Sequence, residues 1–550
     1  MSTPDPITVE LIGSALSSIV DEMGEALVRS SYSTNIKERR DCSTALFDSA
    51  GNVLCQAEHI PMHLGSFLGV ISHIVERYPS DDIHAGDVFI ANDPYEGGAT
   101  HLPDIVLAEP IFVGADHVGW AVNTAHHADF ADRGHEHIYQ EGIRIPPIKL
   151  YRQGNLQSDI QALFLLNCQV PDERISDLRA QMSANKMGVE RVQALCKKYG
   201  TDLVLSAGDA LLDYAERKMR AGIAAVPDGT YAFGDVFDSN QFPDQLTISV
   251  ELTVSGSEMT LTFDGPPQVR AGLNLVYTSL LASCYYAVKS AINPTILPNA
   301  GLARPLSISA PEGSLLNCKH PAAVEARICA SQRVCDVVHG ALAKAMPGKI
   351  AAAGNGCCTG ATFTGFDEDG SIWVYLETIG GGGGARPNAD GLSGIQVHLT
   401  NTSNLPVEAL ESEYPLSVLK YELVDGSGGM GEYIGGMGIR RVYRVERACR
   451  LGVEVSRTQS NPWGLEGGEE GTKTFLDFGN GNEEFSGVVD VEPGQVIEIV
   501  TPGGGGYGSP EGRSPHSLEH DLAEGSLSRA QEARARATFD SPAVATDGKR

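Results

Sequence analysis

The first clear pattern in the chain is a stripe of apolar residues that begins just after Asp5-Pro6. Its members recur every three or four positions, and they are Leu11, Ile12, Ala15, Leu16, Ile19, Val20, Met23 and Leu27. Asp5 can cap free backbone N–H groups, and Pro6 suits the first helical position. The pattern predicts an amphipathic helix that packs on a core, with docking on a partner protein as the alternative.

Short apolar runs separated by turn residues follow, which is typical of strands. The segment 44–57 predicts a hairpin that turns at 48–52. Further strands are predicted at 88–90, 106–112 and 118–122. Helices are also predicted at 67–78, 171–199 and 202–221, and the charges of both signs interspersed along 173–190 are typical of a solvated helix face.

The second half of the chain shifts toward strands. Alternation at 247–254 and 259–263 around a polar turn predicts another hairpin, and helices are expected at 275–292 and 322–345. Residues 352–500 combine many glycines with short strands, which predicts a β-sandwich, a barrel or a solenoid-like module. A surface helix is predicted at 521–537 and a polar tail at 538–550.

These elements indicate the α+β class, in a mixed multi-domain chain with helical segments packed on β-sheets and a glycine-rich, β-dominated C-terminal half. Five regions are expected: a metal-site α/β region at 1–170, a helical region at 171–225, an α+β region at 226–350, a glycine-rich β region at 351–510, and a surface helix with a polar tail at 511–550.

Charge narrows the possible partners. The 550 residues include 41 Lys and Arg against 70 Asp and Glu, a net charge of −29. Such a surface repels phosphate backbones and anionic lipid, so neither nucleic acid nor a membrane is an expected partner. The chain shows no long apolar run and no secretory signal over Met1–Glu10, so we expect a cytoplasmic protein.

The cysteines and glycines indicate less about function than the charge does. The 11 cysteines contain no C-x-x-C pair, and we expect reduced thiols that lie mostly in the core. Glycines cluster at 380–384, 426–438 and 503–508, where they allow either tight packing between strands or an anion-binding nest. No G-x-x-x-x-G-K-[ST] motif is present, so the standard ATP-binding loop is not expected in this chain.

Histidines and carboxylates concentrate in one part of the sequence. Seven of the 15 histidines lie between His84 and His137. His101 and Asp104 are three residues apart across a turn, His126 follows a predicted strand, and Asp41 precedes the first hairpin. Two imidazoles and two carboxylates suit Zn²⁺, Mn²⁺ or Fe²⁺, and such a metal acidifies a bound water. The alternative is a set of hydrogen-bonded core or surface histidines.

Several motifs in one order resemble the hydantoinase B/oxoprolinase family. They are the segments at 35–41, 60–65, 92–104, 126–129, 140–144, 400–404 with 406–408, and 502–508. The resemblance covers nearly the whole chain up to about Pro510. It implies one subunit of an ATP-dependent cyclic amide hydrolase, of the hydantoinase, oxoprolinase or lactamase type. The partner it implies is a hydantoinase A-type subunit that binds ATP-Mg and phosphorylates the amide oxygen, in a hetero-oligomer.

The same resemblance implies roles for individual residues. It places the metal ligands at His101, Asp104 and His126, with Asp41 as the fourth and Glu38 as the rival for that place. Where many relatives continue with Ile-Gly-Gly, this chain has Phe130-Ala131-Asp132, which leaves the substrate open. Three further residues are candidates for proton relay by their position in the motifs, and they are His127, Asp129 and Glu141.

Two other functions remain open at this point. One is a subunit of an ATP-dependent ketone carboxylase, which would use the same metal. The other is a non-catalytic scaffold that only supports an ATPase subunit. The choice between cyclic amides, the identity of the metal and the stoichiometry are not fixed by the sequence.

Overall fold

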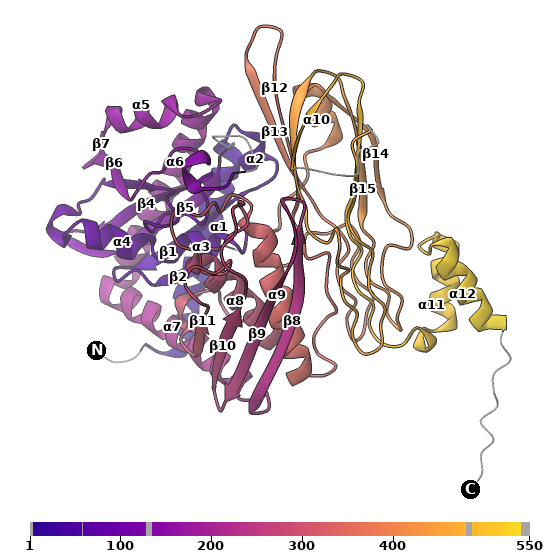
Figure 1. Cartoon of the computed structure of the whole chain (residues 1–550). Coiled ribbons are helices and arrows are strands. Elements are labelled where there is room, and N and C mark those ends of the chain that lie inside the picture. Colours follow the sequence, from indigo (N-terminus) through magenta and orange to yellow (C-terminus); the bar gives the residue numbers. More distant parts are fainter. Residues whose placement is uncertain (1–3, 58, 128–134, 480–486, 541–550) are drawn as a thin grey trace.

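The N-terminal part of the computed structural model is built on a seven-stranded antiparallel sheet (Figure 1). The order is β2-β1-β5-β4-β3-β6-β7. The strands are β1 Cys42–Asp48, β2 Val53–Gln56, β3 Val88–Ala91, β4 Asp104–Val113, β5 Asp116–His126, β6 Ile148–Arg152 and β7 Asn155–Leu156. The structure describes residues 4–57, 59–127, 135–479 and 487–540. The predicted hairpin and the three predicted strands are confirmed.

Helices cover both faces of this sheet. On one face lie α1 (Pro6–Ser30), α6 (Pro171–Tyr199) and α7 (Thr201–Ile223), whose apolar stripes share a core with the sheet. The three predicted helices are confirmed, and Asp5 caps α1 as expected. Leu11 is the exception in the predicted stripe, because its side chain is 55% exposed at the edge of the buried face.

The opposite face is covered by α3 (His63–Phe67) and α4 (Val70–Arg77). The sequence predicted one helix from 67 to 78. Gly69 adopts φ +94°, a left-handed conformation that ends the first helix and starts the second one residue later. This half also contains four short elements: α2 Thr34–Lys37, η1 Ser80–Asp82, η2 Ile138–Gln140 and α5 Ser158–Leu166.

A second, four-stranded sheet follows in the order β11-β10-β9-β8. Its strands are β8 Gly229–Ser239, β9 Phe242–Ser255, β10 Glu258–Asp264 and β11 Leu306–Ser309. Two helices, α8 (Tyr277–Ile292) and α9 (Arg327–Ala345), pack against it and contribute to the largest core cluster. The predicted start of α9 at 322 is wrong by five residues, since 322–326 form a loop that leads into the helix.

The glycine-rich half is a sandwich of two four-stranded sheets, shown at the right of Figure 1. One sheet has the order β13-β12-β16-β18 and the other β14-β15-β19-β17. The strands are β12 Thr359–Phe366, β13 Ile372–Ile379, β14 Leu416–Leu423, β15 Ile439–Val445, β16 Cys449–Glu454, β17 Phe475–Asp477, β18 Val488–Val491 and β19 Val496–Val500. Phe363 and Tyr443 meet across the layers with ring centroids 5.3 Å apart. Of the three predicted architectures, the sandwich is confirmed.

The glycine runs of this half pack backbone against backbone. The amide of Gly382 donates to the carbonyl of Pro502, that of Gly436 to Gly383, and that of Gly504 to Gly436. A Cβ atom on Gly382 would lie 2.0 Å from the Gly436 carbonyl oxygen, so no side chain fits there. Close packing therefore explains these glycines.

The C-terminal part contains α10 (Val407–Glu413), α11 (Pro515–Glu524) and α12 (Arg529–Asp540). The predicted single helix at 521–537 is wrong, because Gly525 at φ +69° ends α11 and a new helix starts four residues later. The predicted tail is helical as far as Asp540, and its remainder, 541–550, lies outside the described residues.

Three further expectations concern the cysteines, membrane spans and domain boundaries. All 11 cysteines are free thiols, and ten of them are buried, as predicted. Within the described ranges, no helix has the length and apolar character needed to cross a bilayer. The largest core cluster runs from Ile60 to Ile499 and thus crosses the expected limits at 225/226 and 350/351, while the domain boundaries themselves stay a prediction.

Candidate metal centre

The ends of three adjacent strands bring the predicted ligands together. Asp104 begins β4 and pairs in register with His126, which ends β5. Asp41 directly precedes β1, and its carbonyl accepts from the His126 amide at 2.9 Å. Because antiparallel neighbours start and end at the same edge of a sheet, these side chains meet there. His101 joins them from the turn before β4.

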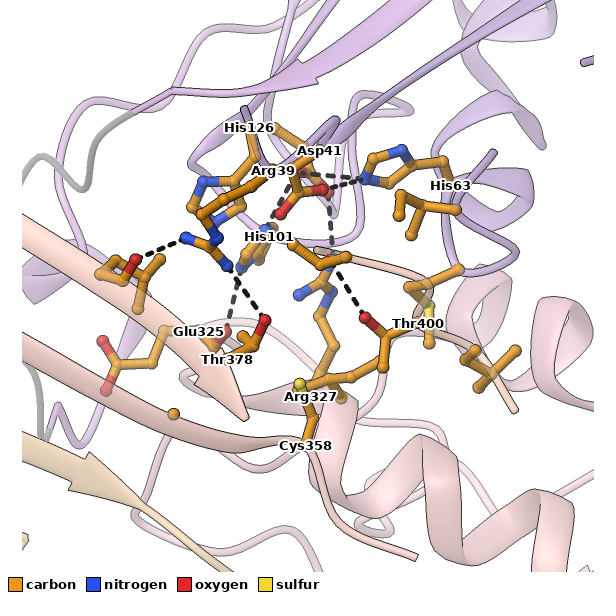
Figure 2. Close-up of a pocket in the computed structure, with 18 of the residues that line it drawn as sticks. Arg39, Asp41, His63, His101, His126, Glu325, Arg327, Cys358, Thr378 and Thr400 are labelled. Carbon is orange, nitrogen blue, oxygen red and sulfur yellow. Dashed lines mark hydrogen bonds and ion pairs between the residues drawn. The ribbon is translucent and has the colours of Figure 1, made fainter. Parts of the chain in front are cut away.

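His101, Asp104 and His126 form a compact buried group. Figure 2 labels the two histidines at the cavity. One potential ligand atom from each lies within 4.8 Å of those of the other two. His101 Nε2 lies 3.1 Å from Asp104 Oδ1, and the two imidazole centroids are 5.1 Å apart. Two nitrogens and a carboxylate at this spacing are a donor set that fits Zn²⁺, Mn²⁺ or Fe²⁺.

Asp41 faces the same cavity of about 70 Å³, whereas the rival Glu38 is exposed to solvent outside it. His63, to which the residue pattern gave no role, also lines this cavity. His63 Nε2 lies 3.4 Å from Asp41 Oδ1 and 3.7 Å from Asp104 Oδ1, and Ser43 holds its other ring nitrogen at 3.0 Å. Asp41 therefore lies on the same cavity as the three clustered residues, and its place as the fourth ligand stays a prediction.

The two carboxylates have different electrostatic surroundings. Burial opposes ionisation of Asp104, but His101 and His63 outweigh it and hold the pKa of Asp104 well below its usual range. Burial raises the pKa of Asp41, and His63 and Arg39 only partly offset this. A divalent cation between the two groups would favour the ionised form of both.

Neighbouring groups fix the orientation of the ligands. His101 Nδ1 lies 3.0 Å from the backbone carbonyl of Glu325, which leaves Nε2 toward Asp104. Arg327 bonds Asp104 Oδ2 at 3.0 Å and Thr100 Oγ1 at 2.7 Å. Partners of this kind determine ring orientation and carboxylate geometry in metal sites.

The residue next to His126 points elsewhere. His127 Nε2 lies 3.0 Å from Gln181 Oε1 of α6, and its ring packs against Phe164. Adjacent residues of an extended chain face opposite sides, so His127 does not reach the cavity. Burial lowers the pKa of His127 to about 4, with Arg174 adding to the effect. The structure does not bring this predicted relay residue to the site.

Glu141 also lies outside the cavity, at the end of η2. Its Oε1 accepts hydrogen bonds from the backbone amides of Val324 and Glu325. The Glu325 carbonyl in turn faces His101. Glu141 thus anchors the loop that orients His101, and its role in proton relay stays a prediction. The third relay candidate, Asp129, lies outside the described residues.

Comparison with known proteins identifies the family. The family model for hydantoinase B/oxoprolinase matches residues 5–510. The chain belongs to this family. It is 37% identical over 540 residues to an uncharacterised protein of Methanocaldococcus jannaschii, covering 95% of this chain and 94% of that one.

Two further relatives have named activities. Caprolactamase subunit beta of Pseudomonas jessenii is 30% identical over 554 residues, with 96% of this chain and 95% of the subunit covered. The crystal structure of ATP-dependent caprolactamase from the same organism superposes with a TM-score of 0.87 over 96% of both chains, at 27% identity. 5-Oxoprolinase 1 of Arabidopsis thaliana is 30% identical over 542 residues, which cover 92% of this chain but 42% of that protein.

The family motifs contained residues whose place at the site was not foreseen. Arg39 and His63 lie in the segments that carried the resemblance, yet residue types alone gave them no role. Arg39 is fully buried and donates to the Leu376 carbonyl at 2.7 Å and to Thr378 Oγ1 at 3.1 Å. Glu325 and Arg327 come from α9 and the loop before it, more than 200 positions away, and no local pattern marks them.

Proposed function

We propose that the chain is the metal-binding, hydrolytic subunit of an ATP-dependent enzyme that opens cyclic amides or imides. The observation that carries this proposal is the buried group His101, Asp104 and His126, with Asp41 on the same cavity. The family supports it, since relatives that match nearly end to end include a caprolactamase subunit.

The division of labour follows from what this chain contains and what its relatives are called. The sequence lacks the standard phosphate-binding loop. A relative of matching length is named a subunit, and in a longer 5-oxoprolinase the match covers 42% of the protein. We assign ATP-Mg binding and phosphorylation of the amide oxygen to a hydantoinase A-type partner, in a hetero-oligomer.

The residues of the cavity have separable tasks. His101, Asp104, His126 and Asp41 would hold the metal, which supplies an acidified water for attack on the activated ring carbon. Arg327 fixes the Asp104 carboxylate, and the Glu325 carbonyl fixes His101. Arg39 places a buried positive charge at the cavity wall, where it favours negative charge that develops on the substrate oxygen.

The proposal is tested by reconstituting the chain with its ATPase partner and measuring ATP turnover against hydantoins, 5-oxoproline and lactams. We expect one ring class to stimulate ATP hydrolysis, with ring opening in proportion, and the Asp104→Asn variant to abolish ring opening. Turnover only with a ketone and bicarbonate would instead establish the carboxylase function, and no stimulated turnover with any of these would favour the scaffold.

A further inference from the structure

A second and larger cavity lies beside the metal cavity and is separate from it. Its volume is about 630 Å³, within the range of small-molecule sites. Tyr286 of α8 and His339 of α9 form one side, and the segments 348–354 and 383–398 form the other. Several apolar side chains line it, and they are Ile350, Leu392, Ile395 and Val397.

The charge of this lining is opposite to that of the protein. Among the described residues that line the cavity, none is Asp or Glu, while Lys349 and Arg386 both contribute cations. The whole chain carries a net charge of −29, and the metal cavity is lined by four carboxylates. A concave region whose charged side chains are all positive concentrates anions, even on so acidic a protein.

One histidine in this wall is held in an unusual conformation. His398 adopts φ +51°, which non-glycine residues seldom do, and such outliers gather at binding sites. Its Nε2 lies 2.9 Å from Oδ1 of the buried Asp336, and Arg457 holds Oδ2 of the same carboxylate at 3.0 Å. The ring of His339 is 5.3 Å from that of His398. Burial lowers the pKa of His339 to about 4, so it offers hydrogen bonding without charge at neutral pH.

We propose that this cavity binds a small organic anion, with a phosphate or carboxylate head group on an apolar body. Lys349, Arg386 and His398 would contact the head group, and the aliphatic wall would contact the body. The inference stands apart from the proposed hydrolysis, because it uses neither the metal ligands nor their cavity.

The cavity has a structural connection to the metal site. Val397 and His398 line the second cavity, while Leu399, Thr400 and Thr402 line the metal cavity. The carbonyl of Leu399 accepts from the Met62 amide at 3.1 Å, next to His63. An occupant of the second cavity would therefore contact residues that directly precede those lining the metal cavity.

The test measures binding of phenyl phosphate, benzoate and neutral benzyl alcohol to the full chain by isothermal titration calorimetry. We expect one site for phenyl phosphate or benzoate and none for the alcohol, and the tighter of the two anions identifies the head group. The Lys349→Glu/Arg386→Glu variant should weaken binding of that anion at least tenfold. The control Arg191→Glu/Lys197→Glu makes the same charge change on the exposed side of α6 and should leave binding unchanged.

A second variant distinguishes a loss of anion binding from a loss of folding. His398→Asn removes the imidazole, and asparagine tolerates the left-handed conformation, so the fold should be retained while anion binding weakens. The proposal is overturned if neither anion binds, if the alcohol binds equally well, or if both variants keep wild-type affinity. It is also overturned if His101→Ala alone removes binding, which would place the anion in the metal cavity.

Discussion

Two neighbouring histidines show how the same side chain acquires different properties in this protein. His126 faces the cavity beside His101 and Asp104, whereas His127 is enclosed between Gln181 and Phe164 on the other side of the strand end. Burial and the nearby charge of Arg174 favour the neutral imidazole and outweigh the opposing effect of Asp177, so the pKa of His127 falls to about 4.

The pKa of His127 predicts a specific pH dependence of stability. Between about pH 6.5 and 4 the unfolded chain binds a proton at this residue and the native chain does not, so stability falls as the pH falls. At the acid end of this pH range, protonation of His127 in the unfolded chain lowers the free energy of unfolding by about 3 kcal/mol. Replacing His127 by Gln, which can still donate to Gln181, should flatten the profile in urea denaturation measured at several pH values. An unchanged slope in the variant would contradict the assignment.

Glu141 gives a second test at single residues, because a positioning role and a proton relay predict different results. Glu141→Gln keeps an oxygen that accepts from Val324 and Glu325, so metal affinity and ring opening should stay close to wild type. Glu141→Ala removes the anchor of the His101 loop and should weaken metal binding about 10–100-fold. Metal titration of the two variants measures the change in metal affinity. Loss of turnover in Glu141→Gln with intact metal affinity would restore the relay hypothesis.

Residue types alone predicted part of the site. The spacing of His101 and Asp104 and the strand before His126 were visible locally, and the structure brings these three together. The contributions of Arg327 and the Glu325 carbonyl were not visible, because they depend on how α9 packs against a strand edge distant in sequence. The resemblance named Asp41 and Glu38 together, and only the fold separates the one in the cavity from the one in solvent.

At the scale of elements, sequence periodicity predicted long helices and strands well and interruptions poorly. The 25-residue α1 has regular apolar spacing and an N-cap at Asp5, the 29-residue α6 begins at a proline, and both helices were predicted. The breaks at Gly69 and Gly525 were missed because a single glycine inside an apolar pattern is compatible with either a helix interior or a helix end.

The glycine runs predict a sharp difference between two Gly→Ala substitutions. In Gly382→Ala the new methyl group would meet the Gly436 carbonyl and the Gly504 amide, both backbone atoms, so we expect destabilisation by about 3 kcal/mol or more. Gly265→Ala is the matched control, because its methyl group would only touch Leu316 at 3.4 Å. Thermal or chemical denaturation of the two variants checks this, and equal stabilities would disprove the close-packing explanation.

At the scale of the whole molecule, the site depends on parts of the chain that are far apart. The ligands come from the first sheet, Arg327 comes from α9, and Thr378 at the end of β13 receives a hydrogen bond from Arg39. The largest core includes Met219 and Ile223 of α7 together with residues of the later sheets. The metal cavity therefore lies where the first sheet, α9 and the sandwich meet.

This arrangement predicts that a fragment ending at residue 225 is not an independent metal-binding unit. It would lack Arg327 and the Glu325 carbonyl and would expose apolar residues of the shared core. We expect the fragment to bind the metal at least tenfold more weakly than the full chain, as measured by competition with a metal-sensitive dye. Full-chain affinity in the fragment would show that the ligands suffice without the rest of the fold.

The most direct measurement for the central claim is the metal content of the full chain by inductively coupled plasma mass spectrometry. The wild type and the His520→Ala variant, which alters an exposed histidine of α11, should each retain about one divalent ion per chain. The His101→Ala variant should retain none while keeping its fold by circular dichroism. Stoichiometric metal in His101→Ala, or none in the wild type purified with its partner, would contradict the proposed centre.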